Sequence, residues 1–101
     1  MILTIFKEDD VSHFSIEGRL DSFTSTKLQE KLLHAMTEAN TIRLDFQNVE
    51  YITSAGLRVL LLGEKTARSQ GKSICMINVP DKVMNIFKMT GFADMLNIIG
   101  K

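Results

Sequence analysis

The side chain best placed for chemistry is the hydroxyl of Ser54, in the stretch Thr53-Ser54-Ala55-Gly56 between a predicted strand and a predicted helix. The first amides of a helix have no partner within the helix, and the helix dipole makes that end positive. A serine here can cap the helix by accepting a hydrogen bond from an amide, in this case that of Gly56 or Leu57. The same end stabilises a phosphate group. We therefore predict that Ser54 is an N-cap and a candidate phosphoryl acceptor. The alternative is a cap alone, with Gly56 easing close packing.

A second group of polar residues precedes another predicted helix. Asp21, Ser22 and Thr24 are each a possible N-cap for that helix. The Asp21 carboxylate could also contact a protein partner near the Ser54 junction, or simply hold a turn. Arg58, in the second turn of the helix after Ser54, either binds an acidic partner surface or is a solvated charge.

Catalytic motifs are missing around these residues. Gly56 follows Ser54 at the spacing of a Gly-x-Ser-x-Gly nucleophile, but Ile52 stands where the first glycine would be. Neither a Gly-x-x-x-x-Gly-Lys-Ser/Thr nor a Gly-x-Gly-x-x-Gly loop occurs. His13 and His34 have no cysteine, histidine or carboxylate at metal-binding spacing, so we expect them to fill surface or core positions. We expect no enzyme activity, no metal and no cofactor, with a nucleotide-binding protein as an alternative.

Size and charge narrow the remaining possibilities. The 101 residues suffice for one domain, residues 1–101, and 12 basic residues balance 12 acidic ones. A chain without net charge has no long-range attraction for nucleic acid or for an anionic membrane. No apolar run approaches the ~20 residues of a membrane-spanning helix, and the first residues do not resemble a signal peptide. Because Cys75 is the only cysteine, no internal disulfide can form, and we expect a cytoplasmic protein.

Apolar periodicity predicts strands and helices in alternation. Strands are expected at residues 2–6, 11–16, 42–46 and 73–79, with a loop at 18–22 and a bridge at 48–52. Helices are expected before Asn40, from about Ala55 to Gln70, and from Asp81 to Thr90, with one more turn and a strand or tail at 96–99. This order predicts an α/β fold with a single mixed β-sheet of four or five strands and helices mainly on one face.

The periodicity also predicts which residues are buried. Ile42, Leu44 and Phe46 alternate with polar residues, which gives that strand one dry face. The helix residues expected to point inward are Leu57, Leu60, Leu61 and Ala67, and those expected in the core or at its boundary are Met84 and Met89 beside Phe87.

Five segments match a known family pattern in order and spacing. They are Gly18-Arg19-Leu20-Asp21, Leu44-Asp45-Phe46, Tyr51-Ile52-Thr53-Ser54-Ala55-Gly56-Leu57, Gly71-Lys72 and Phe87-Lys88-Met89-Thr90-Gly91-Phe92. On these residues the whole chain resembles a stand-alone STAS domain of the anti-sigma-factor antagonist type.

The resemblance implies partner switching controlled by a serine. In that family the unphosphorylated domain binds a serine-kinase anti-sigma factor of the histidine-kinase-like ATPase fold, which frees a sigma factor. The kinase phosphorylates the serine that Ser54 matches, the complex dissociates, and a metal-dependent serine phosphatase reverses the modification. The partner-binding residues implied here are Asp21, Ser22, Thr24, Thr53, Ala55, Gly56, Leu57 and Arg58.

The chain departs from the usual family pattern at several of these positions. Thr53 and Ala55 stand where Asp and Ser or Thr are common, and Arg19 and Arg58 replace Glu and Gly. These departures leave open which kinase recognises the site and whether Thr53 is an alternative acceptor. Two alternatives remain within the family: a constitutive STAS scaffold that is never phosphorylated, and a regulator of secretion, stress or biofilm formation.

Overall fold

The computed structural model describes residues 1–100, and Lys101, the last residue of the expected domain, lies outside the described residues. The elements are strands β1 (Ile2–Glu8), β2 (Val11–Leu20), β3 (Thr41–Ile52) and β4 (Ser73–Ile77), helices α1 (Ser22–Ala35), α2 (Ser54–Ser69) and α3 (Asp81–Thr90), and the 3₁₀ turn η1 (Phe92–Asp94). The strands form one sheet in the order β1-β2-β3-β4, in which β1 runs antiparallel to β2 and the other neighbours run parallel. The predicted mixed α/β sheet is confirmed.

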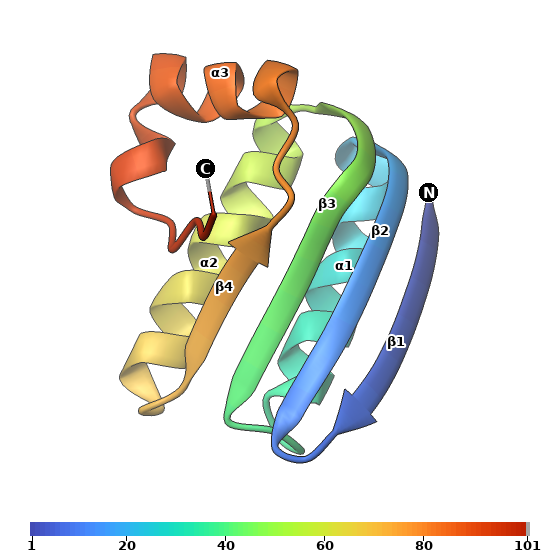
Figure 1. The fold of residues 1–101 in the computed structure, drawn as a ribbon, viewed down its shortest axis with the longest axis vertical. Coiled ribbons are helices and arrows are strands. Elements are labelled where there is room, and N and C mark those ends of the chain that lie inside the picture. The colour runs from blue at the N-terminus through green and yellow to red at the C-terminus, as the bar shows by residue number, and fades with distance from the viewer. Residues whose placement is uncertain (101) are drawn as a thin grey trace.

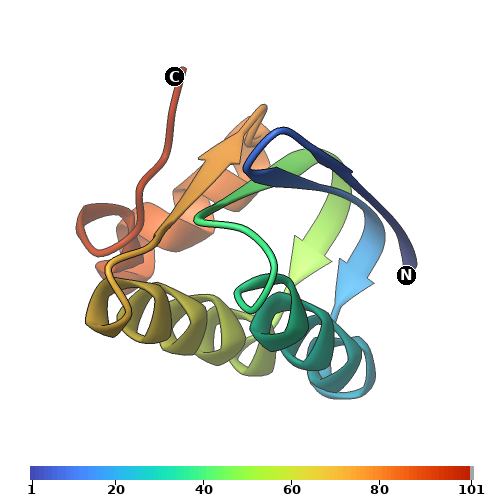
Figure 2. The same ribbon diagram turned by 90° about the horizontal axis from the view of Figure 1, so that it is seen from below.

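The helices lie mainly on one face of the sheet, as predicted. Figure 2 shows α1 and α2 side by side beneath that face, while the other face has no helix over it. Figure 1 shows α3 at the end of the sheet where α1 and α2 begin. Because β2 and β3 are parallel and each leads into a helix, their last residues and both helix starts meet at one edge. We call this the carboxyl edge.

The core lies between the sheet and the helices. The fully buried residues include Phe14, Ile16, Leu28, Leu32, Ile42, Leu44 and Phe46, together with Leu57, Leu60, Ala67 and Phe87. Leu61 and Met84 are only half-buried. The expectation that Met89 lies in or beside the core is wrong, since its side chain is exposed. Helix α3 buries Val83 and Phe87, four residues apart on one face, and this turns Met89 toward solvent.

Strands β2 and β3 are longer than predicted. The expected loop at 18–22 is strand as far as Leu20, and the expected bridge at 48–52 is the end of β3. The pairing moves from Ser15↔Asp45 to Glu17↔Asn48, and from Gly18↔Val49 to Arg19↔Tyr51. At each shift β3 holds one extra residue, a β-bulge, which interrupts the alternation of buried and exposed side chains. The alternating sequence pattern therefore stops although the strand continues. Strand β4, by contrast, ends at Ile77, before Asn78 with a φ of 55°.

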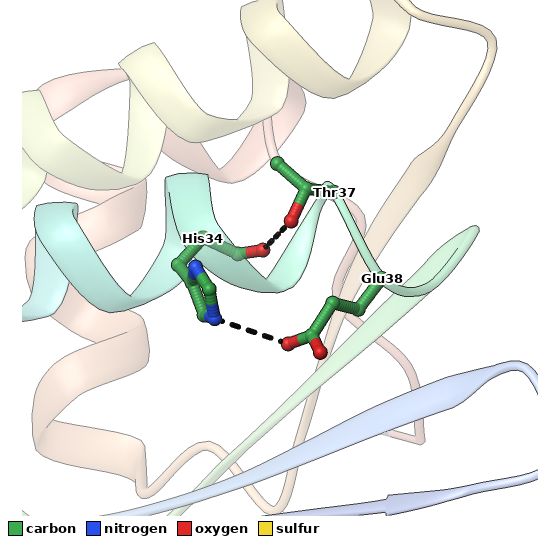
Figure 3. Close-up of polar contacts among 3 residues, drawn as sticks. All are labelled: His34, Thr37 and Glu38. Carbon is green, nitrogen blue, oxygen red and sulfur yellow. Dashed lines mark hydrogen bonds and ion pairs between the residues drawn. The ribbon is translucent and has the colours of Figure 1, made fainter.

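Side chains close the carboxyl end of α1. The helix ends at Ala35 and not near Asn40. Figure 3 shows the Thr37 hydroxyl donating to the His34 carbonyl at 2.6 Å and His34 Nε2 lying 3.2 Å from Glu38 Oε1. The ammonium group of Lys72 donates to the carbonyl of Met36. The bonds from Thr37 and Lys72 satisfy carbonyls at the end of the helix, and the contact between His34 and Glu38 joins two side chains.

Helix α2 ends close to the predicted residue: Ser69 is its last residue, Gln70 is the C-cap, and Gly71 follows with a φ of 70°. The Lys72 amide donates to the Ala67 carbonyl at 2.8 Å and the Gly71 amide to the Arg68 carbonyl at 3.3 Å. This is the Schellman arrangement, which requires a left-handed residue at that point and so favours glycine. Within residues 1–100, no helix has both the length and the apolar character needed to cross a membrane.

Candidate functional site

The Ser54 junction lies at the carboxyl edge, where β3 ends and α2 begins. The prediction that Ser54 is the N-cap is wrong: Thr53 is the N-cap, with extended backbone, and Ser54 is the first residue of the helix. The side chain of Ser54 is exposed, and it makes no hydrogen bond with any described residue. Its hydroxyl is therefore exposed and not engaged in capping the helix.

Thr53 is held by a neighbouring strand. Its amide donates to the Leu20 carbonyl at 2.9 Å, and its Oγ1 donates to the same oxygen at 3.1 Å. This hydroxyl points back to β2 and makes no capping hydrogen bond to the amides of α2. Of the two hydroxyls, the exposed one of Ser54 is therefore the better candidate to accept a phosphoryl group.

The first backbone amides of α2 are available to bind an anion. The first amide bonded within the helix is that of Leu57, which donates to the Thr53 carbonyl at 3.0 Å. The amides of Ser54, Ala55 and Gly56 precede it and have no acceptor inside the helix, and no side chain caps them. A negative charge at this end gains about 0.3–1 kcal/mol from the helix dipole.

Gly56 brings the start of α2 into contact with the sheet. A Cβ atom at this position would lie 2.8 Å from Ile52 Cγ1 and 3.0 Å from both Cβ and the carbonyl oxygen of Leu20. Leu57 is buried directly after it, and Ala55 is half-buried. Of the residues predicted on this helix, Ser54 and Arg58 are the exposed ones, and the others position them.

The start of α1 is the second half of the site, and it is closed. Asp21 is the N-cap, and its Oδ1 accepts hydrogen bonds from the amides of Phe23 and Thr24, each at 3.0 Å. Thr24 Oγ1 accepts from the Asp21 amide at 2.9 Å and donates to the Arg19 carbonyl at 2.7 Å. This is a capping box. The bond from the Thr24 amide, ahead of the other contacts, lowers the pKa of the Asp21 carboxyl, although desolvation opposes it.

Hydrogen bonds bring the two helix starts together. Leu20, the last residue of β2, pairs with Ile52 of β3, and its carbonyl holds Thr53. Asp21 and Ser22 follow Leu20 directly, so the predicted residues of both helices share the carboxyl edge. Ser22 occupies the first position of α1 and is exposed, as Ser54 is on α2.

Phe23 is a candidate contact residue that the sequence analysis missed. It stands between two predicted residues, Ser22 and Thr24, and its ring is 88% exposed in the first turn of α1. A large apolar side chain in that position has no packing role in the domain. The available signal was its place at a helix start outside the apolar stripe of Leu28 and Leu32.

The surroundings of Ser54 lack the groups needed for catalysis. His13 lies near the start of β2 and His34 near the end of α1, and both belong to the opposite end of the domain (Figure 1). Residues 1–100 hold no cluster of three His, Cys, Asp or Glu side chains suited to a metal. A cleft of about 570 Å³ is lined by residues of β2, β3 and the start of α3, among them Glu17, Gln47 and Lys82, and not by Ser54.

Comparison with known proteins gives a consistent result. A family model described as "Mlab, STAS domain" matches residues 4–99. An anti-sigma-B factor antagonist of Listeria monocytogenes is 30% identical over 95 residues, which cover 91% of this chain and 83% of that protein.

Solved structures have the same fold. The structure of the anti-sigma factor antagonist SpoIIAA in its unphosphorylated form gives a TM-score of 0.82 at 14% identity, covering 99% of this chain and 90% of that one. The structure of the Bacillus cell fate determinant SpoIIAA in the phosphorylated form gives 0.76, also at 14% identity, covering 99% and 93%.

Proposed function

The chain belongs to the STAS domain family, and from this premise we propose that it is an anti-sigma-factor antagonist whose binding is controlled by phosphorylation of Ser54. The observation that carries the proposal is the free, exposed hydroxyl of Ser54 at an uncapped helix start. The name of the Listeria relative and the two phosphorylation states of SpoIIAA support it.

In the proposed cycle, the unphosphorylated carboxyl edge binds a serine-kinase anti-sigma factor of the histidine-kinase-like ATPase fold, and the sigma factor is released. The kinase then phosphorylates Ser54, and the complex dissociates. A metal-dependent serine phosphatase restores the binding state. The domain itself is non-catalytic, because the groups that would activate a serine lie elsewhere in the fold, and we place this exchange in the cytoplasm.

The physical basis of the switch is a charge within a neutral interface. Phosphorylation adds about −1.5 to −2 charges at neutral pH. Burying an unpaired charge against a partner costs a few kcal/mol, which corresponds to roughly 30-fold or more in affinity. The domain itself tolerates the phosphate, because the open amides and the dipole of α2 stabilise it. Phosphorylation therefore weakens binding without unfolding the protein.

Phe23 supplies an apolar anchor for the same partner. Exposed aromatic side chains contribute a large share of the binding energy in many interfaces, where they insert into a pocket of the partner. The capping box fixes the backbone beneath Phe23, so the ring is presented with little loss of entropy. Asp21 and Thr24 support this anchor, and Ser22, Ser54 and Arg58 are also exposed in the first turns of α1 and α2.

The test is phosphorylation in a purified system. The chain is incubated with the serine-kinase anti-sigma factor of its source bacterium and Mg-ATP, and the modified residue is mapped by mass spectrometry. We expect one phosphate on Ser54 and none on Ser54→Ala, which should still bind the kinase. Thr53→Ala is the matched variant and should still be phosphorylated.

Binding of the phosphorylated and unmodified chains is then compared by calorimetry, with Phe23→Ala as a second variant. We expect both phosphorylation and Phe23→Ala to weaken binding. A phosphate found on Thr53 would contradict the assignment of the acceptor. Equal binding by both forms of the chain would identify a constitutive scaffold.

A further inference from the structure

Strand β1 leaves one edge of the sheet open. At the opposite edge, β4 is covered by the carboxyl-terminal segment: the Met76 amide donates to the Asn97 carbonyl at 2.9 Å, and the Ile99 amide donates to the Met76 carbonyl at 2.8 Å. Within residues 1–100, β1 has β2 as its one neighbour. Half of its backbone amides and carbonyls therefore point outward, available to another strand.

This open edge is apolar and without the usual protection. The side chain of Ile2 is 62% exposed, that of Phe6 54% and that of Ile5 39%. Proteins usually guard an exposed edge strand with proline, inward-pointing charges or a bulge. Residues 2–6 contain no proline and no charge, and they pair regularly with β2. Lys7 and Glu8 follow only at the end of the strand.

The side chains of β1 are complementary to a second copy of the same strand. In an antiparallel pair centred on Thr4, Ile2 of one copy lies opposite Phe6 of the other, and Leu3 lies opposite Ile5. Facing residues lie on the same side of a sheet, so Ile2 and Phe6 meet on the helix-free face and Leu3 and Ile5 on the helix-covered face. Moving the centre to Ile5 would set Lys7 and Glu8 against apolar residues. The register centred on Thr4 is thus the favoured one.

We infer that β1 is an interface with a second copy of this chain, joined antiparallel about a two-fold axis at Thr4. Such a pair is isologous and closed, and it joins the two four-stranded sheets into one. Five residues from each copy bury little area. Interfaces of this size are weak, so we expect a dissociation constant on the order of 10–100 µM.

The inferred β1 interface is separate from Ser54 and the carboxyl edge. Strand β1 borders β2 on the side away from β3 and α2, so pairing through β1 leaves Ser54 accessible. The inference does not depend on the proposed function, since it rests on the edge strand alone. In a dimer, the two carboxyl edges would be available to two partner molecules.

The test uses a pair of charge variants. One copy carries Ile2→Lys and Phe6→Lys, and the other carries Ile2→Glu and Phe6→Glu. Alone, each places like charges opposite one another across the two-fold axis and should sediment as a monomer. When they are mixed, the introduced lysines lie opposite the introduced glutamates, and the mass should rise toward twice the 11.4 kDa of one chain. Met89→Lys changes an equally apolar exposed residue far from β1 and should self-associate like the wild type.

Wild-type protein provides a measurement without substitutions. Amide NMR shifts that depend on concentration and are confined to residues 2–6 are expected between about 10 µM and 1 mM, the range around the dissociation constant. A monomeric wild type at 1 mM would overturn the inference. So would charge variants that self-associate like the wild type, or a mixture of folded variants that stays monomeric.

Discussion

The two helices that begin at the carboxyl edge differ in how their first turns are closed. Both start directly after a parallel strand, and both have an exposed serine at the first helical position, Ser22 on α1 and Ser54 on α2. At α1 the carboxylate of Asp21 occupies the amides of Phe23 and Thr24. At α2 the corresponding amides remain open, because the Thr53 hydroxyl is bonded to Leu20.

This difference determines where a charge can be added. A negative group on Ser22 would meet the Asp21 carboxylate, which already uses the favourable amides. A negative group on Ser54 would meet unpaired amides and the positive end of the α2 dipole. On the proposed function, this difference would favour Ser54 over the similarly placed Ser22 as the residue that carries the phosphate. The closed helix start, in turn, keeps Phe23 in a fixed position.

The largest expected effect concerns the open helix start and partner binding. We expect Ser54→Asp to lower affinity for the anti-sigma factor by roughly 30-fold or more, because the charge must be desolvated in the interface. In Ser54→Asn the new side chain has nearly the shape of aspartate but no charge, so this variant should bind the anti-sigma factor much more tightly than Ser54→Asp. Calorimetric titration of the two variants separates charge from bulk. Equal losses would mean that size, and not charge, controls binding.

The next largest effect concerns the contact that holds the open helix start against the sheet. Gly56→Ala should cost about 1–3 kcal/mol of unfolding free energy, since the added Cβ meets the Leu20 backbone. Gly63→Ala, in the same helix, is the matched control. Its Cβ would meet the flexible side-chain ends of Ile74 and Leu32 at 3.2 and 3.4 Å. Helix propensity favours alanine by about 1 kcal/mol, so we expect Gly63→Ala to be near neutral in urea unfolding.

Removal of the cap should affect only the closed helix start. Asp21→Ala deletes the acceptor of two amide bonds and should lower Tm by about 5 °C. Ser54→Ala removes a hydroxyl that caps nothing and should change stability by less than about 0.5 kcal/mol. Differential scanning calorimetry measures both. A similar loss for the two variants would show that Ser54 does have a capping role.

A smaller difference should appear when both serines are made acidic. Ser54→Asp should match or slightly exceed the stability of the wild type, whereas Ser22→Asp should be less stable than Ser54→Asp by about 0.5 kcal/mol. Chemical unfolding at low salt gives the two values. The difference should shrink at high salt, because both interactions are between exposed charges.

The smallest effect is a pH dependence at the closed helix start. The folded pKa of Asp21 is lowered, so its contribution to stability is present above the unfolded pKa of about 3.9 and is lost as pH falls through the folded pKa. Asp21→Asn retains a capping oxygen but does not titrate. The stability difference between wild type and Asp21→Asn should therefore decline below about pH 4. A difference that stays constant down to pH 2 would contradict the role of the Asp21 charge.

The sequence predicted the class of fold and the place of Ser54 between a strand and a helix, but not how the helix starts are closed. Apolar periodicity was sufficient to predict the strands and helices, because a sheet covered by helices on one face has strands that alternate between buried and exposed residues. Threonine and serine both favour N-cap positions. Thr53 is the N-cap here, and its hydroxyl is bonded to the carbonyl of Leu20, 33 residues upstream, a contact that the local sequence does not reveal. The ends of β2 and β3 were missed because the bulges interrupt the alternation on which the prediction depended.

Two exposed apolar surfaces were also missed. The outer side of β1 consists of apolar residues that a sequence pattern assigns to the core as readily as to the surface, and its exposure follows from the order of the strands, which depends on contacts between distant segments. The exposure of Phe23, by contrast, follows from its place outside the apolar stripe of Leu28 and Leu32, a local signal that was overlooked.

The bonds from Thr53 to the Leu20 carbonyl have a consequence for how long a signal lasts. They tie the start of α2 to β2, so a phosphate on Ser54 changes the charge of the edge but leaves the backbone beneath it in place. On the proposed function, the two states of the domain then have the same backbone shape and differ by one covalent phosphoester bond. Thermal fluctuation of the chain therefore does not convert one state into the other. The domain would keep its phosphorylated state after the kinase has dissociated, and would lose it only when the phosphoester bond of Ser54 is hydrolysed.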